Sequence, residues 1–263
     1  MIRVNDVEIN SSNFPDGTLL MKLPFTIKPV YEIQWYYEND TELFKLICIV
    51  RHLREKYPSA GIDLFMPYLP NARQDRVKNP EDVFTLKYFC EIINSLEFDT
   101  VFVTDVHSNV GLALLDRVRE IKPWEYINRA ISVIPVDREL MLFYPDEGAM
   151  KRYSFKFNFP YAFGIKDRDW KTGEIKGLKL ANEEIIKGKN ILIIDDICSK
   201  GGTFYYAAKA LKEAGAGNIY LYVTHCENTI HEGELLKENN LIKEIFTTNS
   251  ILTRTHEKIT IVN

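Results

Sequence analysis

The sequence predicts an α/β protein of two halves, each a mainly parallel β-sheet flanked by helices. Short apolar segments alternate with segments whose apolar residues recur at helical spacing, which is typical of βαβ units. Polar loops follow several of the apolar segments, as expected at the carboxyl ends of parallel strands. We predict an N-terminal half at residues 1–125 and a C-terminal half at residues 126–263.

The first half is predicted to contain two helices and two strands. A polar residue followed by apolar residues at helical spacing predicts a helix over 40–53. An apolar strand is predicted at 62–67, and a second amphipathic helix is predicted around 89–96. The segment TVFVT at 100–104 is predicted as the next strand, and it ends in Asp105-Val106-His107.

The second half begins with a segment at 122–130 that we expect to cross between the halves. Strands are predicted at 131–136 and 141–144, with a loop at 145–149. A further strand at 161–165 leads into a polar stretch at 166–177, predicted as a hairpin tip or mobile loop.

The remaining elements follow the apolar run at 191–194, which predicts a buried strand. A helix is expected next, ended by Gly215 and Gly217, and strands are expected at 219–223 and 245–248.

Composition narrows the class of protein. The 263 residues are 46% hydrophobic and 27% charged, with a net charge of −4, which gives no sign of nucleic-acid binding. The four cysteines are widely spaced, which argues against a disulfide framework or structural zinc. The polar N-terminus and the lack of any apolar run near ~18 residues predict a cytoplasmic protein with no membrane partner.

The most informative segment is KNILIIDDICSKGGT at 189–203. Its apolar run leads directly into two carboxylates, Asp195 and Asp196, and ligands of open α/β sheets gather at such strand ends. Carboxylates there can accept hydrogen bonds from sugar hydroxyls. An ordinary strand-to-helix turn is the alternative interpretation, but the paired acids favour a phosphorylated sugar.

The loop after the acids has the residue types that hold phosphate. Gly201 and Gly202 let main-chain amides approach an anion, and Lys200 adds a cation. Thr203 can cap the next helix, whose N-terminus favours negative charge. Further polar loops follow other predicted strands: ARQDR at 72–76, DVH at 105–107, PDEGA at 145–149 and KDRD at 166–169. We expect these loops to converge on one ligand, although each alone is compatible with a solvated or structural role.

Segment 195–203 resembles the phosphoribosyl-pyrophosphate loop of type I phosphoribosyltransferases and of ribose-phosphate pyrophosphokinases. Other segments resemble the second family, in family order: Phe14-Pro15-Asp16-Gly17, Ala72-Arg73-Gln74-Asp75-Arg76, Asp105-Val106-His107, Ile134-Pro135-Val136-Asp137, Pro145-Asp146-Glu147-Gly148, Thr224-His225 and Thr248-Asn249-Ser250. A plain phosphoribosyltransferase is not expected to carry ARQDR or DVH. The chain is therefore identified as a divergent member of the pyrophosphokinase family, with two phosphoribosyltransferase-like halves.

The resemblance implies Mg²⁺-dependent diphosphate transfer from ATP to the anomeric hydroxyl of ribose 5-phosphate, with release of AMP. It implies ATP binding by Asp16, Arg73, Gln74, Asp75 and His107. It implies ribose-phosphate binding by Asp195, Asp196, Ser199, Lys200, Gly201, Gly202 and Thr203. It implies Mg²⁺ binding by His107 and Asp146. Lys166 and Arg168 match the catalytic basic pair, which neutralises charge developing in the transition state.

The chain also departs from the family pattern. The Phe14–Gly17 motif comes early, so we expect a typical opening strand–helix unit to be missing, and Thr18 replaces a usual acid. We expect a homo-oligomer, a dimer or higher, without assuming the familiar hexamer. In Ser199-Lys200-Gly201 the loop loses the family's acid at the first position and gains a lysine at the second, a change of about +2 in loop charge. That charge suits ribose 5-phosphate, or a larger acceptor such as ADP-ribose in NAD synthesis or salvage.

Two alternatives of other classes remain open. The Thr18 and Ser199 departures are compatible with a catalytically silent regulatory paralogue, against which the retained Lys166, Arg168 and His107 argue. A phosphoribosyltransferase that consumes the pyrophosphorylated sugar is also compatible with segment 195–203 alone.

Overall fold

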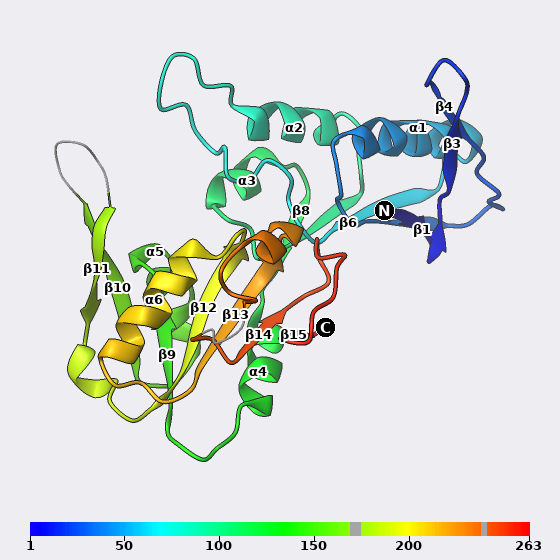
Figure 1. The fold of residues 1–263 in the computed structure, drawn as a ribbon. Helices are drawn as coiled ribbons and strands as arrows, with labels where there is room; N and C mark the ends of the chain where they lie inside the picture. Colours follow the sequence, from blue (N-terminus) through cyan, green and yellow to red (C-terminus); the bar gives the residue numbers. More distant parts are fainter. Residues whose placement is uncertain (169–174, 238–240) are drawn as a thin grey trace. The chain divides into compact units, whose positions relative to one another are not determined.

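The computed structural model describes residues 1–168, 175–237 and 241–263, which form two compact units, Met1–Lys122 and Pro123–Asn263 (Figure 1). Each unit has its own mainly parallel sheet and its own hydrophobic core. The predicted α/β class with two helix-flanked parallel sheets is confirmed. Among the described residues, no helix is both long and apolar enough to cross a membrane.

The sheet of the first unit has six strands in the order β2-β1-β5-β6-β7-β8. Its parallel strands are β5 (Val30–Trp35), β6 (Gly61–Met66), β7 (Thr100–Thr104) and β8 (Val118–Ile121). Two short strands, β1 (Ile2–Val4) and β2 (Val7–Glu8), extend one edge in antiparallel fashion. A separate hairpin is formed by β3 (Ser11–Asn13) and β4 (Leu19–Met21).

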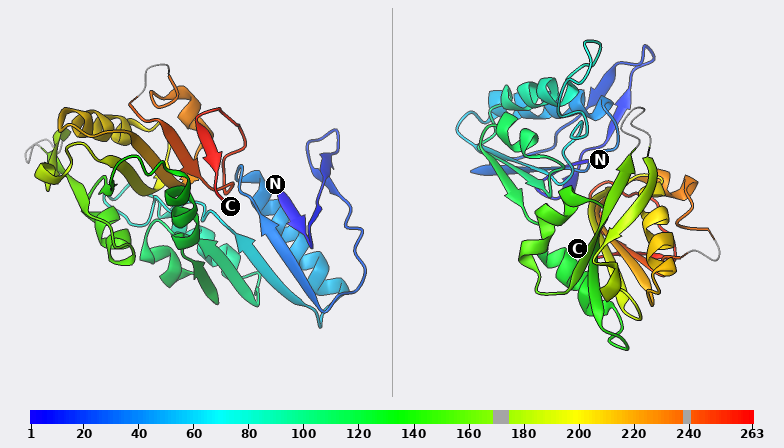
Figure 2. Two further views of the ribbon diagram at one scale, coloured as in Figure 1. Left: turned by 90° about the horizontal axis from the view of Figure 1, so that it is seen from below. Right: turned by 90° about the vertical axis from the view of Figure 1, so that its left-hand side faces the viewer.

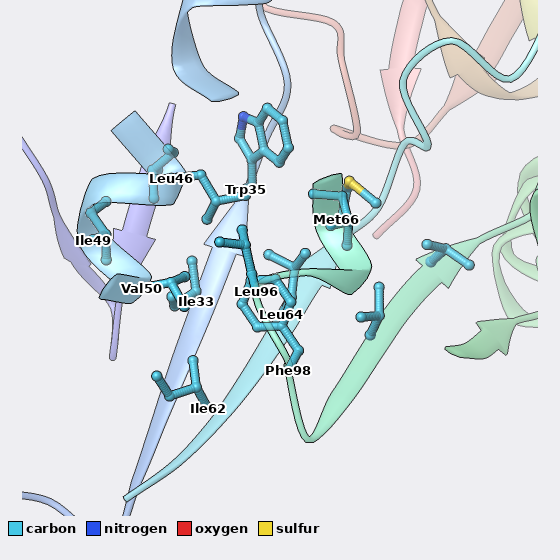
Figure 3. Close-up of a cluster of buried hydrophobic side chains, with 14 of the residues drawn as sticks. Ile33, Trp35, Leu46, Ile49, Val50, Ile62, Leu64, Met66, Leu96 and Phe98 are labelled. Atoms are coloured by element: carbon cyan, nitrogen blue, oxygen red, sulfur yellow. The ribbon is translucent and has the colours of Figure 1, made fainter. Parts of the chain in front are cut away.

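Two helices, α1 (Thr41–Lys56) and α2 (Thr85–Asn94), pack against this sheet, and the shorter α3 (Asn109–Leu114) follows β7. The strands alternate, so every second side chain of β6 enters the core: Ile62, Leu64 and Met66 are all at most 1% exposed. Figure 3 shows these side chains in one cluster with Leu46, Ile49 and Val50 of α1 and with Trp35 of β5. β6 ends at Met66 and β7 at Thr104, and their loops begin there.

The sheet of the second unit has seven strands in the order β11-β10-β9-β12-β13-β14-β15. The strands are β9 (Leu140–Tyr144), β10 (Tyr161–Arg168), β11 (Ile175–Ala181), β12 (Asn190–Cys198), β13 (Ile219–Cys226), β14 (Glu244–Thr247) and β15 (Ile259–Ile261). All neighbours are parallel except β10 and β11. β12 therefore lies inside the sheet, where its run of apolar residues is buried on both faces.

Helices cover both faces of this sheet. Ile191 and Ile193 of β12 pack with α6 (Gly202–Glu213), whereas Leu192 and Ile194 pack with α4 (Trp124–Val133) and α5 (Glu147–Tyr153). Burying one such side chain contributes roughly 1.5–3 kcal/mol. Short 3-10 helices complete the unit: η1 (Ser154–Lys156), η2 (Glu183–Ile185) and η3 (Asn228–Glu232).

A buried asparagine fixes the start of β12. Asn190 is fully buried; its side-chain amide donates to Asp137 Oδ1 at 3.0 Å, and its Oδ1 accepts from the Asn218 amide at 3.0 Å. Because buried polar groups require partners, these bonds hold one position of the strand relative to its neighbours. Asp137 belongs to the Ile134–Asp137 segment singled out in the sequence, so that segment has a structural role.

Strands β10 and β11 form a ribbon that extends past the rest of the sheet (Figure 2). β10 pairs with β9 only at Tyr161, Ala162 and Phe163. From Phe163 to Arg168 it pairs with β11, which is the edge strand. The hairpin predicted after 161–165 is thus present, although its strands reach into the segment predicted to be a tip or mobile loop. Residues 169–174 lie outside the described residues.

Several predicted elements were wrong. Residues 122–130, expected to cross between halves, and 131–136, expected to be a strand, instead contain α4, whose Ile127 and Ala130 pack under the sheet together with Ile134. The run Ile131–Ile134 contains β-branched residues, which favour strands locally, but the spacing of the buried residues is helical. The loop predicted at 145–149 is largely the first turn of α5. The sequence interpretation also missed β1, β5, β8 and α3.

Candidate active site

Strand β12 carries both predicted sugar-binding carboxylates within its own length. The expected strand at 191–194 continues through Asp195 and Asp196 to Cys198, because β13 pairs with it along this whole stretch. Its other neighbour, β9, pairs only as far as Ile193. The carboxylates therefore lie where β12 extends beyond β9, at the carboxyl end of the sheet.

The two carboxylates have different environments. Asp196 is 4% exposed, and its Oδ2 lies 3.2 Å from Nη1 of Arg152 on α5. Asp195 is half-buried, and its Oδ1 accepts a hydrogen bond from the Asp196 amide at 2.9 Å. Burial raises the pKa of Asp195 well above its usual range, and the neighbouring charge of Asp196 raises it further. The end of β12 is thus an acidic site.

Asp146 also contributes to this acidic end. It directly precedes α5, where its Oδ1 accepts a hydrogen bond from the Ala149 amide at 3.0 Å. Its charge is a smaller cause of the raised pKa of Asp195, which places the two carboxylates within electrostatic reach of each other. The structure therefore brings together Asp146, Asp195 and Asp196 in the second unit.

The loop after β12 turns directly into α6, so the positive end of that helix lies at the predicted phosphate-binding residues. Gly201 has φ +79°, a left-handed conformation that favours glycine. Ser199 Oγ is buried and has no hydrogen-bond partner among the described residues. Thr203 lies in the first turn of α6. This loop presents main-chain amides and a buried hydroxyl next to the carboxylates.

The segment after β13 packs against this loop. Lys200 Nζ lies 3.0 Å from Glu232 Oε2, an exposed ion pair. A Cβ on Gly201 would lie 2.6 Å from Leu235 Cγ, and a Cβ on Gly233 would lie 2.8 Å from the carbonyl carbon of Lys200. Both glycines therefore lie at close contacts between the two segments.

A buried polar cluster ties the end of β13 to residues 248–250. The Thr224 carbonyl accepts hydrogen bonds from the hydroxyls of Thr248, at 2.7 Å, and Ser250, at 3.3 Å. His225 Nδ1 lies 2.8 Å from Ser250 Oγ. The two sequence segments that resembled later family landmarks are thus packed together, with His225 only 3% exposed.

In the first unit the structure brings together two predicted ATP loops. Asp75 is 7% exposed, and Arg76 donates to it from Nε at 2.7 Å. This bond lowers the pKa of Asp75, and Ser108 and His107 lower it further. Asp75 is therefore a neighbour of His107 and Ser108, on the loop after β7.

Other predicted ATP residues have defined positions as well. Gln74 Oε1 accepts a hydrogen bond from Thr85 at the start of α2, at 3.0 Å. Asp105, just after β7, has φ +42°, an uncommon conformation for a residue other than glycine, and is 1% exposed. Arg73 is exposed on the loop after β6. The loop after β6 is thus tied to the start of α2 through Gln74 and to the loop after β7 through Asp75.

Asp16 lies apart from these loops, in the turn between β3 and β4. Its Oδ1 accepts hydrogen bonds from the amide and the hydroxyl of Thr18, at 3.0 and 2.7 Å. These bonds lower the pKa of Asp16. Thr18, noted in the sequence as a departure, therefore orders the turn that carries Asp16, with Gly17 at φ +86°.

Lys166 and Arg168 lie on the ribbon, on strand β10, and not on a loop. Lys166 pairs with Leu178 and Arg168 with Ile175 in the ladder to β11, with an irregularity between Asp167 and Arg168. The side chains of these two predicted catalytic residues lie outside the described part of the chain. Their backbone positions place both on the segment of β10 that extends past β9.

Sequence reasoning missed two residues that contact the site. Arg152, the partner of Asp196, lies on α5, whose first residues were predicted as a loop and whose remaining residues were assigned to no element. Glu232, the partner of Lys200, is 32 positions away in the sequence, and no local pattern connects them. Among the described residues, no group of three or more His, Cys, Asp or Glu side chains has an arrangement that could itself hold a metal ion.

Comparisons with known proteins identify similar chains over nearly the full length. The phosphoribosyl transferase domain family matches residues 151–257, which include β12, the loop and α6. The ribose-phosphate pyrophosphokinase of Pyrococcus abyssi is 30% identical over 98% of this chain and 89% of its own length. The enzyme of the same name from Saccharolobus solfataricus is 29% identical over 97% of this chain and 88% of its own.

A solved structure shows the same fold. The phosphoribosylpyrophosphate synthetase of Mycobacterium smegmatis superposes with a TM-score of 0.79 and 18% identity, covering 97% of this chain and 87% of that one. The matched region therefore includes residues of both units of the present structure.

Proposed function

This chain belongs to the ribose-phosphate pyrophosphokinase family, and on that premise we propose that it transfers the β,γ-diphosphate of ATP to the 1-hydroxyl of ribose 5-phosphate. The products are phosphoribosyl pyrophosphate and AMP. The observation that carries the proposal is the end of β12, where paired carboxylates, a buried serine hydroxyl and a helix N-terminus follow one another within nine residues, 195–203.

We assign the two ends of the sugar to the two parts of this segment. Asp195 and Asp196 accept hydrogen bonds from the ribose 2- and 3-hydroxyls, since carboxylates are acceptors for such donors. The 5-phosphate binds at the loop, to main-chain amides of 200–203 and the hydroxyls of Ser199 and Thr203. The unpaired Ser199 Oγ supports this assignment, because a phosphate oxygen supplies the partner that a buried hydroxyl requires.

The reaction is an in-line displacement at the β-phosphorus of ATP. The anomeric oxygen of the bound sugar forms a bond to that phosphorus while the bond to the AMP oxygen breaks, and the hydroxyl proton is released. Such transfers depend on positioning and on neutralising charge. We assign Lys166 and Arg168 to neutralise the charge that develops on the departing AMP oxygen and the α-phosphate. We assign Arg73, Gln74, Asp75, His107 and Asp16 to ATP.

The residues present fit a magnesium ion. Mg²⁺ binds through one or two carboxylates together with substrate phosphates and water, and Asp146 lies within electrostatic reach of the acidic pair on β12. We propose that Asp146 of the second unit is a carboxylate ligand of Mg²⁺. We assign His107 of the first unit to the Mg²⁺ that accompanies ATP, where an imidazole acts through water. Bound Mg²⁺ supplies positive charge to the polyphosphate of ATP.

ADP-ribose is a second candidate acceptor, because its terminal ribose offers the same anomeric hydroxyl. The sequence Ser199-Lys200-Gly201 favours it through its added cation. The pairing of Lys200 with Glu232 weakens that argument, because it leaves the two side chains together electrically neutral. Ribose 5-phosphate is therefore the first choice.

One assay separates the candidates. Purified protein is incubated with ATP, Mg²⁺ and either ribose 5-phosphate or ADP-ribose, and the nucleotides are resolved by ion-exchange chromatography. AMP formed together with a pyrophosphorylated sugar supports the proposal and identifies the acceptor. If neither acceptor yields AMP, the proposal fails. ATP binding without turnover then indicates a silent paralogue, and base-dependent release of pyrophosphate indicates a phosphoribosyltransferase.

A further inference from the structure

The loop that we assign to the 5-phosphate contacts a second segment of the chain, and the contact is between main-chain atoms. Residues Asn228–Leu235, which we call the support segment, comprise η3 and the three residues after it. A Cβ on Gly233 would lie 2.8 Å from the Lys200 carbonyl carbon and closer still to its oxygen, nearer than Cβ atoms approach other atoms in proteins. The main chain of Gly233 therefore lies directly against the main chain of Lys200.

The support segment is itself firmly anchored. Ile230 and Leu235 are fully buried in the core that also contains α6. Asn228 Oδ1 accepts hydrogen bonds from the amides of Thr253 and Arg254, both at 3.1 Å. Just before the segment, the Glu227 amide donates to the Cys198 carbonyl at 2.8 Å. The support segment is therefore held in place by the rest of the second unit, independently of the loop that packs against it.

The requirement for glycine at 233 is steric alone. Its backbone angles, φ −94° and ψ −172°, are extended and accessible to any residue. Alanine at this position would cause no backbone strain. Any effect of Gly233→Ala must therefore come from the contact between its Cβ and the main chain of Lys200. That contact is at the loop, two residues before the first residue of α6.

We propose that Gly233 is a positioning residue for the acceptor. Because glycine has no side chain, the support segment packs directly against the phosphate loop, residues 199–203, and holds the main-chain amides of that loop where they bind the 5-phosphate. This inference rests on the proposed function. A side chain at 233 pushes the Lys200 peptide away and displaces the amides that bind the phosphate. Because binding geometry must hold within about 0.5 Å, the displacement weakens the acceptor and leaves ATP, bound elsewhere, unaffected.

The test compares Gly233→Ala with wild type and with Gly61→Ala. Gly61 is a matched control, because a Cβ there would meet its nearest neighbours at an ordinary 3.4 Å. Steady-state kinetics measure the KM of ribose 5-phosphate and of ATP, and hydrogen–deuterium exchange follows the peptide that contains residues 199–203. We expect Gly233→Ala to raise the acceptor KM about tenfold, change the ATP KM less than twofold and speed exchange in that peptide at least threefold. Gly61→Ala should change none of these.

Each result decides the inference. It is overturned if folded Gly233→Ala binds the acceptor as wild type does, or if the KM values of acceptor and ATP rise together. Should Gly233→Ala fail to fold by circular dichroism, Leu235→Ala is measured instead, and an unchanged acceptor KM then counts against the inference. If wild type turns over no acceptor, the proposed function fails, and peptide exchange alone decides whether Gly233 holds the loop.

Discussion

Lys200 Nζ lies 3.0 Å from Glu232 Oε2, so the cation of the candidate phosphate loop already has an anionic partner on the support segment. Both side chains are more than half exposed, which makes the pair weak and sensitive to salt. While the pair is formed, Lys200 Nζ is held toward Glu232 and competes only in part for a phosphate.

Replacing Glu232 by glutamine should release Lys200 toward the ligand. We expect Glu232→Gln to bind ribose 5-phosphate about twofold more tightly at low ionic strength, and as wild type does at about 0.5 M salt, where exposed charges are screened. Calorimetric titration at the two ionic strengths measures this. Glu213→Gln, the matched control, removes the same charge at the far end of α6 and should have no effect. An equal gain in affinity for ribose 5-phosphate in Glu232→Gln and Glu213→Gln would show that the net charge of the protein, and not the pair with Lys200, causes the effect.

The raised pKa of Asp195 predicts that this carboxylate destabilises the fold at neutral pH. Burial and Asp196 disfavour its charged form, so the native state holds its proton to higher pH than the unfolded chain does. Stability from this group is therefore fully present below the usual value of 3.8 and falls as pH rises toward the raised folded pKa.

Asp195→Asn should consequently melt at a higher temperature than wild type at pH 7, and this difference should narrow as pH falls toward 4. The same variant should bind ribose 5-phosphate more weakly, because the carboxylate that we assign to the ribose hydroxyls is replaced by a neutral amide. Melting followed by circular dichroism across pH, with Asp116→Asn at an exposed position as control, tests the first part. A melting difference that does not vary with pH would contradict it.

A close contact at Gly201 predicts a specific rescue. Gly201→Ala places a side chain at positive φ, which costs about 1–2 kcal/mol, and forces a Cβ against Leu235. Combining it with Leu235→Ala removes the overlap but leaves the strain. We expect the double variant to lose less stability than the sum of the singles, by about 1 kcal/mol. Urea unfolding of all four proteins measures this coupling, and strict additivity would show that the contact has no energetic effect.

The assignment of Lys166 predicts an effect on turnover more than on binding. If its contact strengthens in the transition state, Lys166→Ala should lower kcat by roughly 10²-fold or more and change the KM values less than threefold. Lys179→Ala, on the paired strand of the same ribbon, is the control and should retain its kcat. A normal kcat in Lys166→Ala would remove this residue from the mechanism.

How far the sequence predicts the molecule differs from element to element. β7 was predicted at its observed bounds, because TVFVT is a self-contained apolar run between polar segments. β12 was predicted too short, since carboxylates suggest a loop and only the ladder with β13 shows that the strand continues to Cys198. α4 was predicted incorrectly because Ile131–Ile134 has local strand preference, which packing under the sheet overrides.

Some residues of the candidate site could be recognised in the sequence, and others could not. The loop after β12 was recognisable because its residues are contiguous, so the whole phosphate-binding pattern appears in one segment. Arg152, Glu232 and Gly233 were not recognisable, because each acts on that segment through a contact formed only in the folded chain. A site formed by contiguous residues can be recognised in the sequence, whereas residues that contact it from elsewhere in the chain are found only in the folded structure.

The ribbon of β10 and β11 has a consequence for how such a site can evolve. Past Phe163, the ladder of β10 is with β11 and not with β9, so changes of length or twist there leave the hydrogen bonds of β9, β12 and β13 intact. Lys166 and Arg168 thus lie on a part of β10 whose ladder is separate from the ladder that holds Asp195 and Asp196. On the proposed assignments, the ribbon that carries the residues acting on ATP can change in length without altering the strand that binds the acceptor.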